Sequence, residues 1–103
     1  MDAVYVVAYR HSGAAALVAA GQGRLEVDGL VGLYPMDRYL EQDAVAAADR
    51  IDVPLLLIGV SGALAQAAPP GTEFARVEPP VIFTASGDRV ADTVLEFIAS
   101  LES

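Results

Sequence analysis

The stretch AVYVVAYRHSGAAALVAA, residues 3–20, decides the fold of this chain. Its first part, Val4–Tyr9, is an almost unbroken apolar run, which is typical of a strand that is buried on both faces. A short polar turn, Arg10-His11-Ser12, follows, and Gly13–Ala20 consists almost wholly of small apolar residues. The stretch therefore predicts a strand, a tight turn and a helix in immediate succession.

Three further apolar runs predict strands of the same kind. They are Gly29–Tyr34, Val53–Val60 and Val77–Thr84, the last of which contains two prolines. Continuous apolar runs, rather than alternating ones, indicate strands of a parallel sheet that is covered on both faces.

Helical patterns lie between and after these runs. Besides Gly13–Ala20 we expect helices over Asp37–Ile51, Gly62–Ala68 and Asp88–Leu101. The second and the last of the four carry apolar residues at helical spacing on one face. Asp37 would lie on the polar side of its helix as a solvated charge.

The alternation of strands and helices predicts one α/β domain over residues 1–103, with a four-stranded, mainly parallel sheet and flanking helices. Crossovers between parallel strands are right-handed. If the strands follow the chain order, the three connecting helices share one face, and only the last helix can cover the other. The edge at Val4–Tyr9 and part of that second face would then be bare and apolar. A doubly wound order with the first strand in the centre would avoid this.

Composition excludes several classes of function. The 103 residues include no cysteine, no lysine, six arginines and one histidine, and the net charge is −8. Nucleic acids and anionic membrane surfaces require clustered basic residues, so we expect neither as a partner. With His11 alone and no cysteine, we expect no metal site and no cofactor. Without a signal peptide or a spanning segment, we expect a cytoplasmic protein.

The strand, turn and helix at the start also have the layout of a nucleophile elbow, a sharp turn that exposes a reactive side chain at the top of a sheet. The usual G-x-S-x-G sequence is absent. Ser12 and His11 are the candidates for the reactive position. Alternatively, Ser12 is simply the N-cap of the helix, and Arg10 beside a helix N-terminus could bind an anion.

Taken together, four segments resemble the C-terminal half of an α/β-hydrolase. They are VYVVAYRHSGAAALVAA for the elbow, RLEVDGLVGLYP for the next strand, IDVPLLLIG for the strand that delivers the catalytic acid, and DRVADTVLEFIASL for the terminal helix. The resemblance implies that fold and an acyl-hydrolase ancestry, and GLVGLYP favours the dienelactone-hydrolase-like branch.

The catalytic positions that the resemblance implies are degenerate here. No aspartate or glutamate follows Val53–Ile58 before residue 63, and no histidine precedes the terminal helix at residues 78–84. A serine hydroxyl is a weak nucleophile without a positioned base.

Three functions follow as hypotheses. The first is a non-catalytic α/β-hydrolase-like domain that acts by association, either as a homo-oligomer or with a second protein chain. The second is a hydrolase that uses Ser12 or His11 in a site completed by another chain. The third is a module that binds an anion or an acyl compound through Arg10, Ser12, Tyr34 and Ser61.

Overall fold

A computed structural model describes residues 3–76 and 87–102 of the chain. It contains a four-stranded parallel sheet flanked by helices, so the expected α/β class is confirmed. The strands of this sheet are β1 (Tyr5–Tyr9), β2 (Gly29–Leu33), β5 (Leu55–Ile58) and β6 (Glu73–Ala75). They lie in the order β1-β2-β5-β6, which is the order of the chain.

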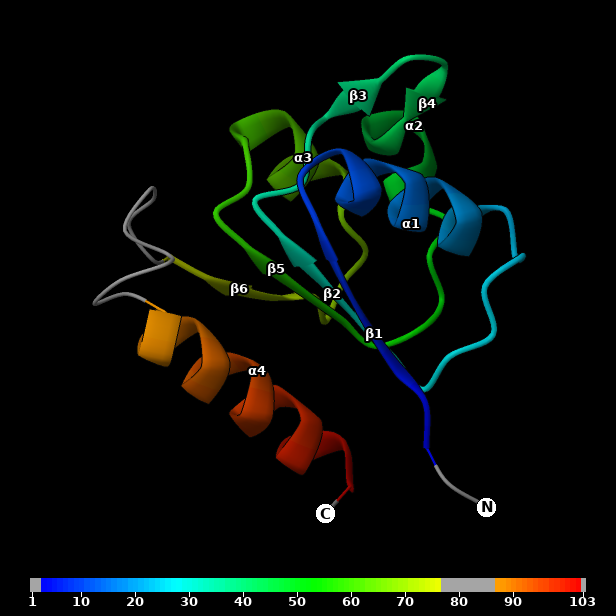
Figure 1. The fold of residues 1–103 in the computed structure, drawn as a ribbon. Helices are drawn as coiled ribbons and strands as arrows, with labels where there is room; N and C mark the ends of the chain where they lie inside the picture. Colours follow the sequence, from blue (N-terminus) through cyan, green and yellow to red (C-terminus); the bar gives the residue numbers. More distant parts are fainter. Residues whose placement is uncertain (1–2, 77–86, 103) are drawn as a thin grey trace.

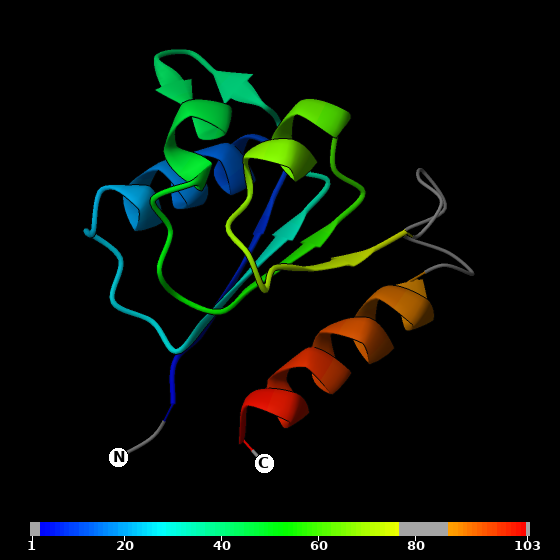
Figure 2. The same cartoon turned by 180° about the vertical axis from the view of Figure 1, so that it is seen from behind.

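The helices divide unequally between the two faces of the sheet. They are α1 (His11–Gly21), α2 (Ala44–Ala48), α3 (Gly62–Ala67) and α4 (Gly87–Glu102). The first three lie on one face and α4 lies alone on the other (Figures 1 and 2). The doubly wound alternative is therefore wrong, and β1 is an edge strand whose outer side is paired with no strand of the described residues, which we call the open edge. No helix of the described segments is long and apolar enough to cross a membrane.

Two apolar clusters hold these layers together. The cluster between the sheet and α1–α3 contains Leu17, Leu30 and Leu57, all at most 1% exposed. The cluster beneath α4 contains Val31, Leu56 and Ile58 from β2 and β5, packed against Val90 and Phe97. The four residues of β5 are all buried, because this strand is covered on both faces.

The helix expected over Asp37–Ile51 is wrong in its first half. Residues 38–43 form a small antiparallel hairpin of β3 (Arg38–Tyr39) and β4 (Gln42–Asp43), and α2 begins only at Ala44. The physical reason is a helix cap, because the Asp43 carboxylate accepts a hydrogen bond from the Ala46 N–H at 3.1 Å. The apolar stripe that suggested a longer helix is buried from Ala44 onward. Helix α2 ends at Ala48, three residues before the expected end at Ile51.

The boundaries of the other elements agree with the expected ones to within two residues, with one exception. The fourth strand is Glu73–Ala75, whereas the expected strand Val77–Thr84 lies outside the described residues. The predicted N-cap role of Ser12 is also wrong. The helix begins at His11, two residues earlier than expected, and Arg10 occupies the cap position without a side-chain hydrogen bond.

Close packing of α1 against α2 yields a test of this arrangement. A Cβ atom on Gly21 would lie 2.4 Å from the Ala47 carbonyl oxygen, whereas one on Gly62 would meet nothing within 4 Å. Alanine normally stabilises a helix by about 0.5–1 kcal/mol relative to glycine. We expect Gly21→Ala instead to destabilise the protein by about 1–2 kcal/mol through overpacking. Urea unfolding measures the change.

Gly62→Ala is the matched control for this prediction, because it places the same methyl group in another helix where space is open. It should leave the free energy of unfolding unchanged or raise it. Equal effects of the two substitutions would contradict the α1–α2 packing.

Candidate functional site

The turn between β1 and α1 has a strained backbone at Arg10. This residue has φ 54° and ψ −116°, a conformation that side chains other than glycine rarely adopt. The turn is fixed from both sides. The Arg10 N–H donates to the Leu33 carbonyl at 3.1 Å, and its own carbonyl accepts from Ala14 and Met36 at 3.2 and 3.1 Å.

The strain lies at Arg10 and at neither His11 nor Ser12, the two candidates for the reactive position. In a nucleophile elbow, the reactive side chain sits on the strained strand-to-helix turn. Here that residue is Arg10, while His11 and Ser12 already belong to the first turn of α1. A guanidinium stays protonated at all ordinary pH values and cannot attack a carbonyl group.

His11 and Ser12 are both exposed. The His11 ring packs against Tyr39 of the hairpin, with the ring centroids 4.9 Å apart and the planes at 32°. Among the described residues there is no group of three or more histidine, cysteine or acidic side chains that could hold a metal.

The other predicted binding residues follow the carboxyl ends of the strands, so they lie at the same end of the sheet as Arg10. Tyr34 follows β2 and Ser61 follows β5, as Arg10 follows β1. A chain of backbone hydrogen bonds ties these ends together, from Arg10 to Leu33, from Tyr34 to Ile58 and from Gly59 to Ala75. Open α/β sheets bind ligands at the carboxyl ends of their strands where the strand order reverses, and among the described strands the order β1-β2-β5-β6 contains no such reversal.

Tyr34 and Ser61 have structural roles, the first in core packing and the second as a helix cap. Tyr34 is only 7% exposed and belongs to the cluster beneath α4. Its ring lies directly against Gly59, where a Cβ would be 2.2 Å from Cδ1 of Tyr34. The Ser61 hydroxyl accepts from the Leu64 N–H at 3.1 Å, and it donates to the Asp37 carboxylate. Ser61 is therefore the N-cap of α3.

The Asp37–Ser61 contact is a feature that the sequence did not predict. Asp37 was expected to be a solvated charge on a helix, but it lies in the turn before β3 and its hydrogen bond to Ser61 is partly buried. The signal that could have found it is the serine just before a short helix, which predicts a cap that an acidic partner can orient.

Apolar side chains are exposed on both edge strands of the sheet, at Phe74 on β6, which is 50% exposed, and along β1. The side chains of Val7 and Tyr9 are 48% and 40% exposed, although their neighbours Val31 and Leu33 on β2 pack in the cluster beneath α4. Val4, just before the strand, is 53% exposed. We call Val7 and Tyr9, which share the α4 face of the sheet, the β1 patch. Val7 is half exposed because α4 packs on β2 and β5 and reaches β1 at Tyr5, through Glu102.

Charged groups mark the two ends of β1. At its amino end, the Asp28 carboxylate accepts from the Val4 N–H at 2.8 Å, and the Glu102 carboxylate accepts from the Tyr5 hydroxyl at 3.1 Å. Burial, the hydrogen bond to Glu102 and the charges of Glu102 and Asp28 raise the pKa of Tyr5 above its ordinary value. At the carboxyl end of the strand stands Arg10.

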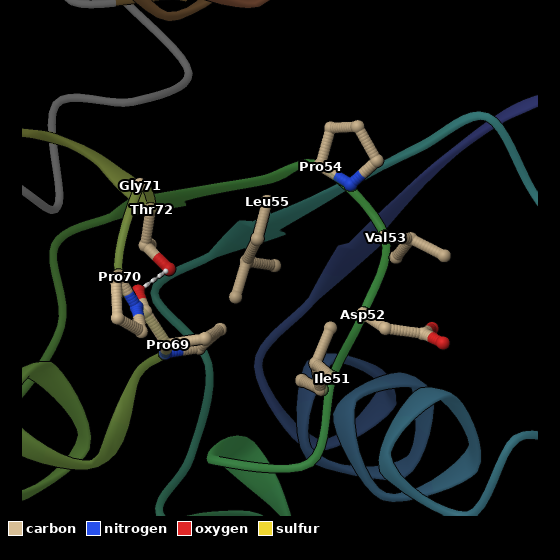
Figure 3. Close-up of a pocket in the computed structure, with 9 residues that line it drawn as sticks. All are labelled: Ile51, Asp52, Val53, Pro54, Leu55, Pro69, Pro70, Gly71 and Thr72. Atoms are coloured by element: carbon tan, nitrogen blue, oxygen red, sulfur yellow. Dashed lines mark hydrogen bonds between the residues drawn. The ribbon is translucent and has the colours of Figure 1, made fainter.

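A hollow at the opposite end of the sheet is separate from all of these residues. Figure 3 shows it between the loops that precede β5 and β6, with a volume of about 260 Å³. Its lining includes Asp52, three prolines and Thr72, whose hydroxyl donates to the Pro69 carbonyl at 2.7 Å. It contains a single titratable side chain, so it offers no acid–base pair for catalysis.

No protein-family model, curated protein or solved structure matches this chain.

The strain at Arg10 can be measured directly. We expect Arg10→Gly to be more stable than Arg10→Ala by about 1–2 kcal/mol, because glycine adopts this φ and ψ without a steric cost. Both variants remove the guanidinium, so the alanine variant controls for the loss of the charge. Chemical denaturation measures the difference, and equal stabilities would contradict the strained turn.

The hydrolase hypothesis has a separate test. We expect Ser12→Ala and His11→Ala to leave the hydrolysis of a p-nitrophenyl ester unchanged, because neither residue occupies the strained position. The initial rate of p-nitrophenolate release measures it. A rate that falls to the buffer background in either variant would contradict this expectation.

Proposed function

We propose that this chain is a non-catalytic domain, resembling the C-terminal half of an α/β-hydrolase, that acts by association through the open edge at β1. The exposure of Val7 in the middle of an unpaired edge strand carries the proposal. Exposed apolar edges of this kind are a template for pairing with another chain, and monomeric proteins normally protect them with charges, prolines or a cover.

The turn supports the non-catalytic part of the proposal. A strand, a strained turn and a helix occur in the order of a nucleophile elbow, but the residue on the turn is an arginine. The Ser61 hydroxyl, although it donates to the Asp37 carboxylate, is engaged as a cap, and the only histidine of the chain packs on Tyr39.

A second copy of the chain is the simplest partner. A different chain that continues the hydrolase-like sheet would occupy the same edge, so both forms of association depend on the β1 patch. Binding of an anion or acyl compound through Arg10, Ser12, Tyr34 and Ser61 has less support, because Tyr34 is buried and Ser61 is engaged as a cap.

Self-association through β1 predicts a charge-sensitive dimer. We expect light scattering after size exclusion to give twice the chain mass of 10.7 kDa for the unaltered protein, and Val7→Lys to reduce it to the monomer. Lysine on an edge strand opposes pairing because its charge would have to be desolvated.

Leu95→Lys is the matched control, because Leu95 is 63% exposed on α4, away from the β1 patch. It should leave the dimer intact, and circular dichroism should show that both variants fold. A chain that is monomeric at every concentration, or a dimer that survives Val7→Lys, would contradict the proposal.

A further inference from the structure

We propose that β1 pairs with β1 of a second copy of this chain, antiparallel and about a two-fold axis that passes through Val7. The inference rests on the proposed function, because it names the partner and the register of that same edge. It would join the two sheets into one continuous sheet.

The backbone of β1 directs unpaired groups outward at Val7. The Arg10 N–H donates to Leu33 and the Val4 carbonyl accepts from Asp28, so the even-numbered residues point their backbone groups toward β2. Successive residues of a strand direct these groups to opposite sides. The N–H and carbonyl of Val7 therefore point away from β2, toward the open edge.

This alternation restricts the register. A partner strand must place its own outward-facing, odd-numbered residues opposite those of β1. An axis through Val7 meets this condition and uses the whole strand, because Val7 then lies opposite Val7 and Tyr5 lies opposite Tyr9. Val7 and its copy would exchange both of their backbone hydrogen bonds, as the hydrogen-bonded pairs of antiparallel sheets do.

Charge favours the antiparallel direction. In this register Arg10 of one copy lies opposite Val4 of the other, whose N–H already holds the Asp28 carboxylate at 2.8 Å. Arg10, Asp28 and Glu102 are all exposed, so the guanidinium can reach the carboxylates at the amino end of the partner strand. A parallel pairing would instead place Arg10 beside Arg10 and the carboxylates beside carboxylates. The antiparallel edge is thus self-complementary although the chain carries a net charge of −8.

The side chains agree with the same register. Val7 lies over the α4 side of the sheet beside Val31 and is 48% exposed. Directly opposite residues of an antiparallel pair have Cβ atoms about 4.5–5.5 Å apart. The axis would therefore bring the two Val7 side chains into contact on the part of this face that α4 leaves bare.

Cysteine cross-linking tests the register, because the chain contains no cysteine of its own. Hydrogen-bonded antiparallel pairs have Cα atoms about 5.5 Å apart, which falls within the range of a disulfide. We expect Val7→Cys to form a covalent dimer under mild oxidation. Tyr5→Cys and Tyr9→Cys should each stay uncross-linked alone and should form a heterodimer when mixed. Gln66→Cys, on the exposed surface of α3, is the control that should not cross-link.

A second measurement uses charge and does not depend on cysteine. Arg10→Glu should weaken dimerisation about tenfold, since it replaces two facing ion pairs by two repulsions. Adding Asp28→Arg to it should restore affinity, because the glutamate introduced at position 10 of one copy then faces the arginine introduced at position 28 of the other. Dilution of the dimer, followed by light scattering, measures both changes.

The outcomes separate this inference from the proposed function. The inference is supported if Val7→Cys cross-links to itself, if Tyr5→Cys cross-links to Tyr9→Cys, and if Asp28→Arg restores the dimer affinity that Arg10→Glu lowers. A dimer that is broken by Val7→Lys but lacks these cross-links overturns the register while the β1 edge remains the interface. A chain that is monomeric overturns both, and cross-linking of Gln66→Cys to the same extent as Val7→Cys overturns the specific pairing.

Discussion

The handedness of the crossovers between parallel strands is the constraint on which this structure depends. Because the four strands lie in chain order, right-handed connections place α1, α2 and α3 on one face of the sheet. One helix, α4, is then left for the other face. It covers β2 and β5, as the burial of Val31 and Leu56 shows, and leaves Val7 half exposed on β1. The bare edge is therefore a consequence of topology and not of a local defect in the sequence.

Much of this architecture could be predicted from the sequence, because strands that are buried on both faces consist of continuous apolar residues. The central strand β5 is buried at all four positions, and its apolar run was evident. The hairpin over residues 38–43 could not be predicted from periodicity, because its pattern merges with the apolar stripe of α2. Local interactions decided it: Asp43 caps α2, and Tyr39 packs against His11, which is distant in the sequence.

The site was harder to predict than the fold, for a different physical reason. Sequence places a polar turn between β1 and α1, but it does not say which residue adopts the strained conformation. The layout of a strand, a polar turn and a helix suggested Ser12 or His11 as the reactive position. In the structure Gly13 is a buried helical residue, where a Cβ would lie 2.9 Å from Pro35, and Arg10 takes the positive φ without the help of glycine. Gly13 is therefore required for close packing against Pro35 and does not relieve the strain of the turn.

The strained residue is an arginine, and this gives the two ends of β1 opposite charges. Strain on a non-glycine residue persists only where the surroundings over-determine it, and here three backbone hydrogen bonds fix Arg10. The same bonds hold its cation at the carboxyl end of the strand, while Asp28 and Glu102 hold carboxylates at the amino end. The edge strand β1 thus has a positive charge at its carboxyl end and negative charges at its amino end. Salt screens the interaction between exposed charges beyond about 10 Å at ordinary ionic strength. These charges would therefore act only on a strand that lies directly alongside β1. In the proposed dimer they would select the direction of pairing, whereas the apolar contact at Val7 would supply the attraction.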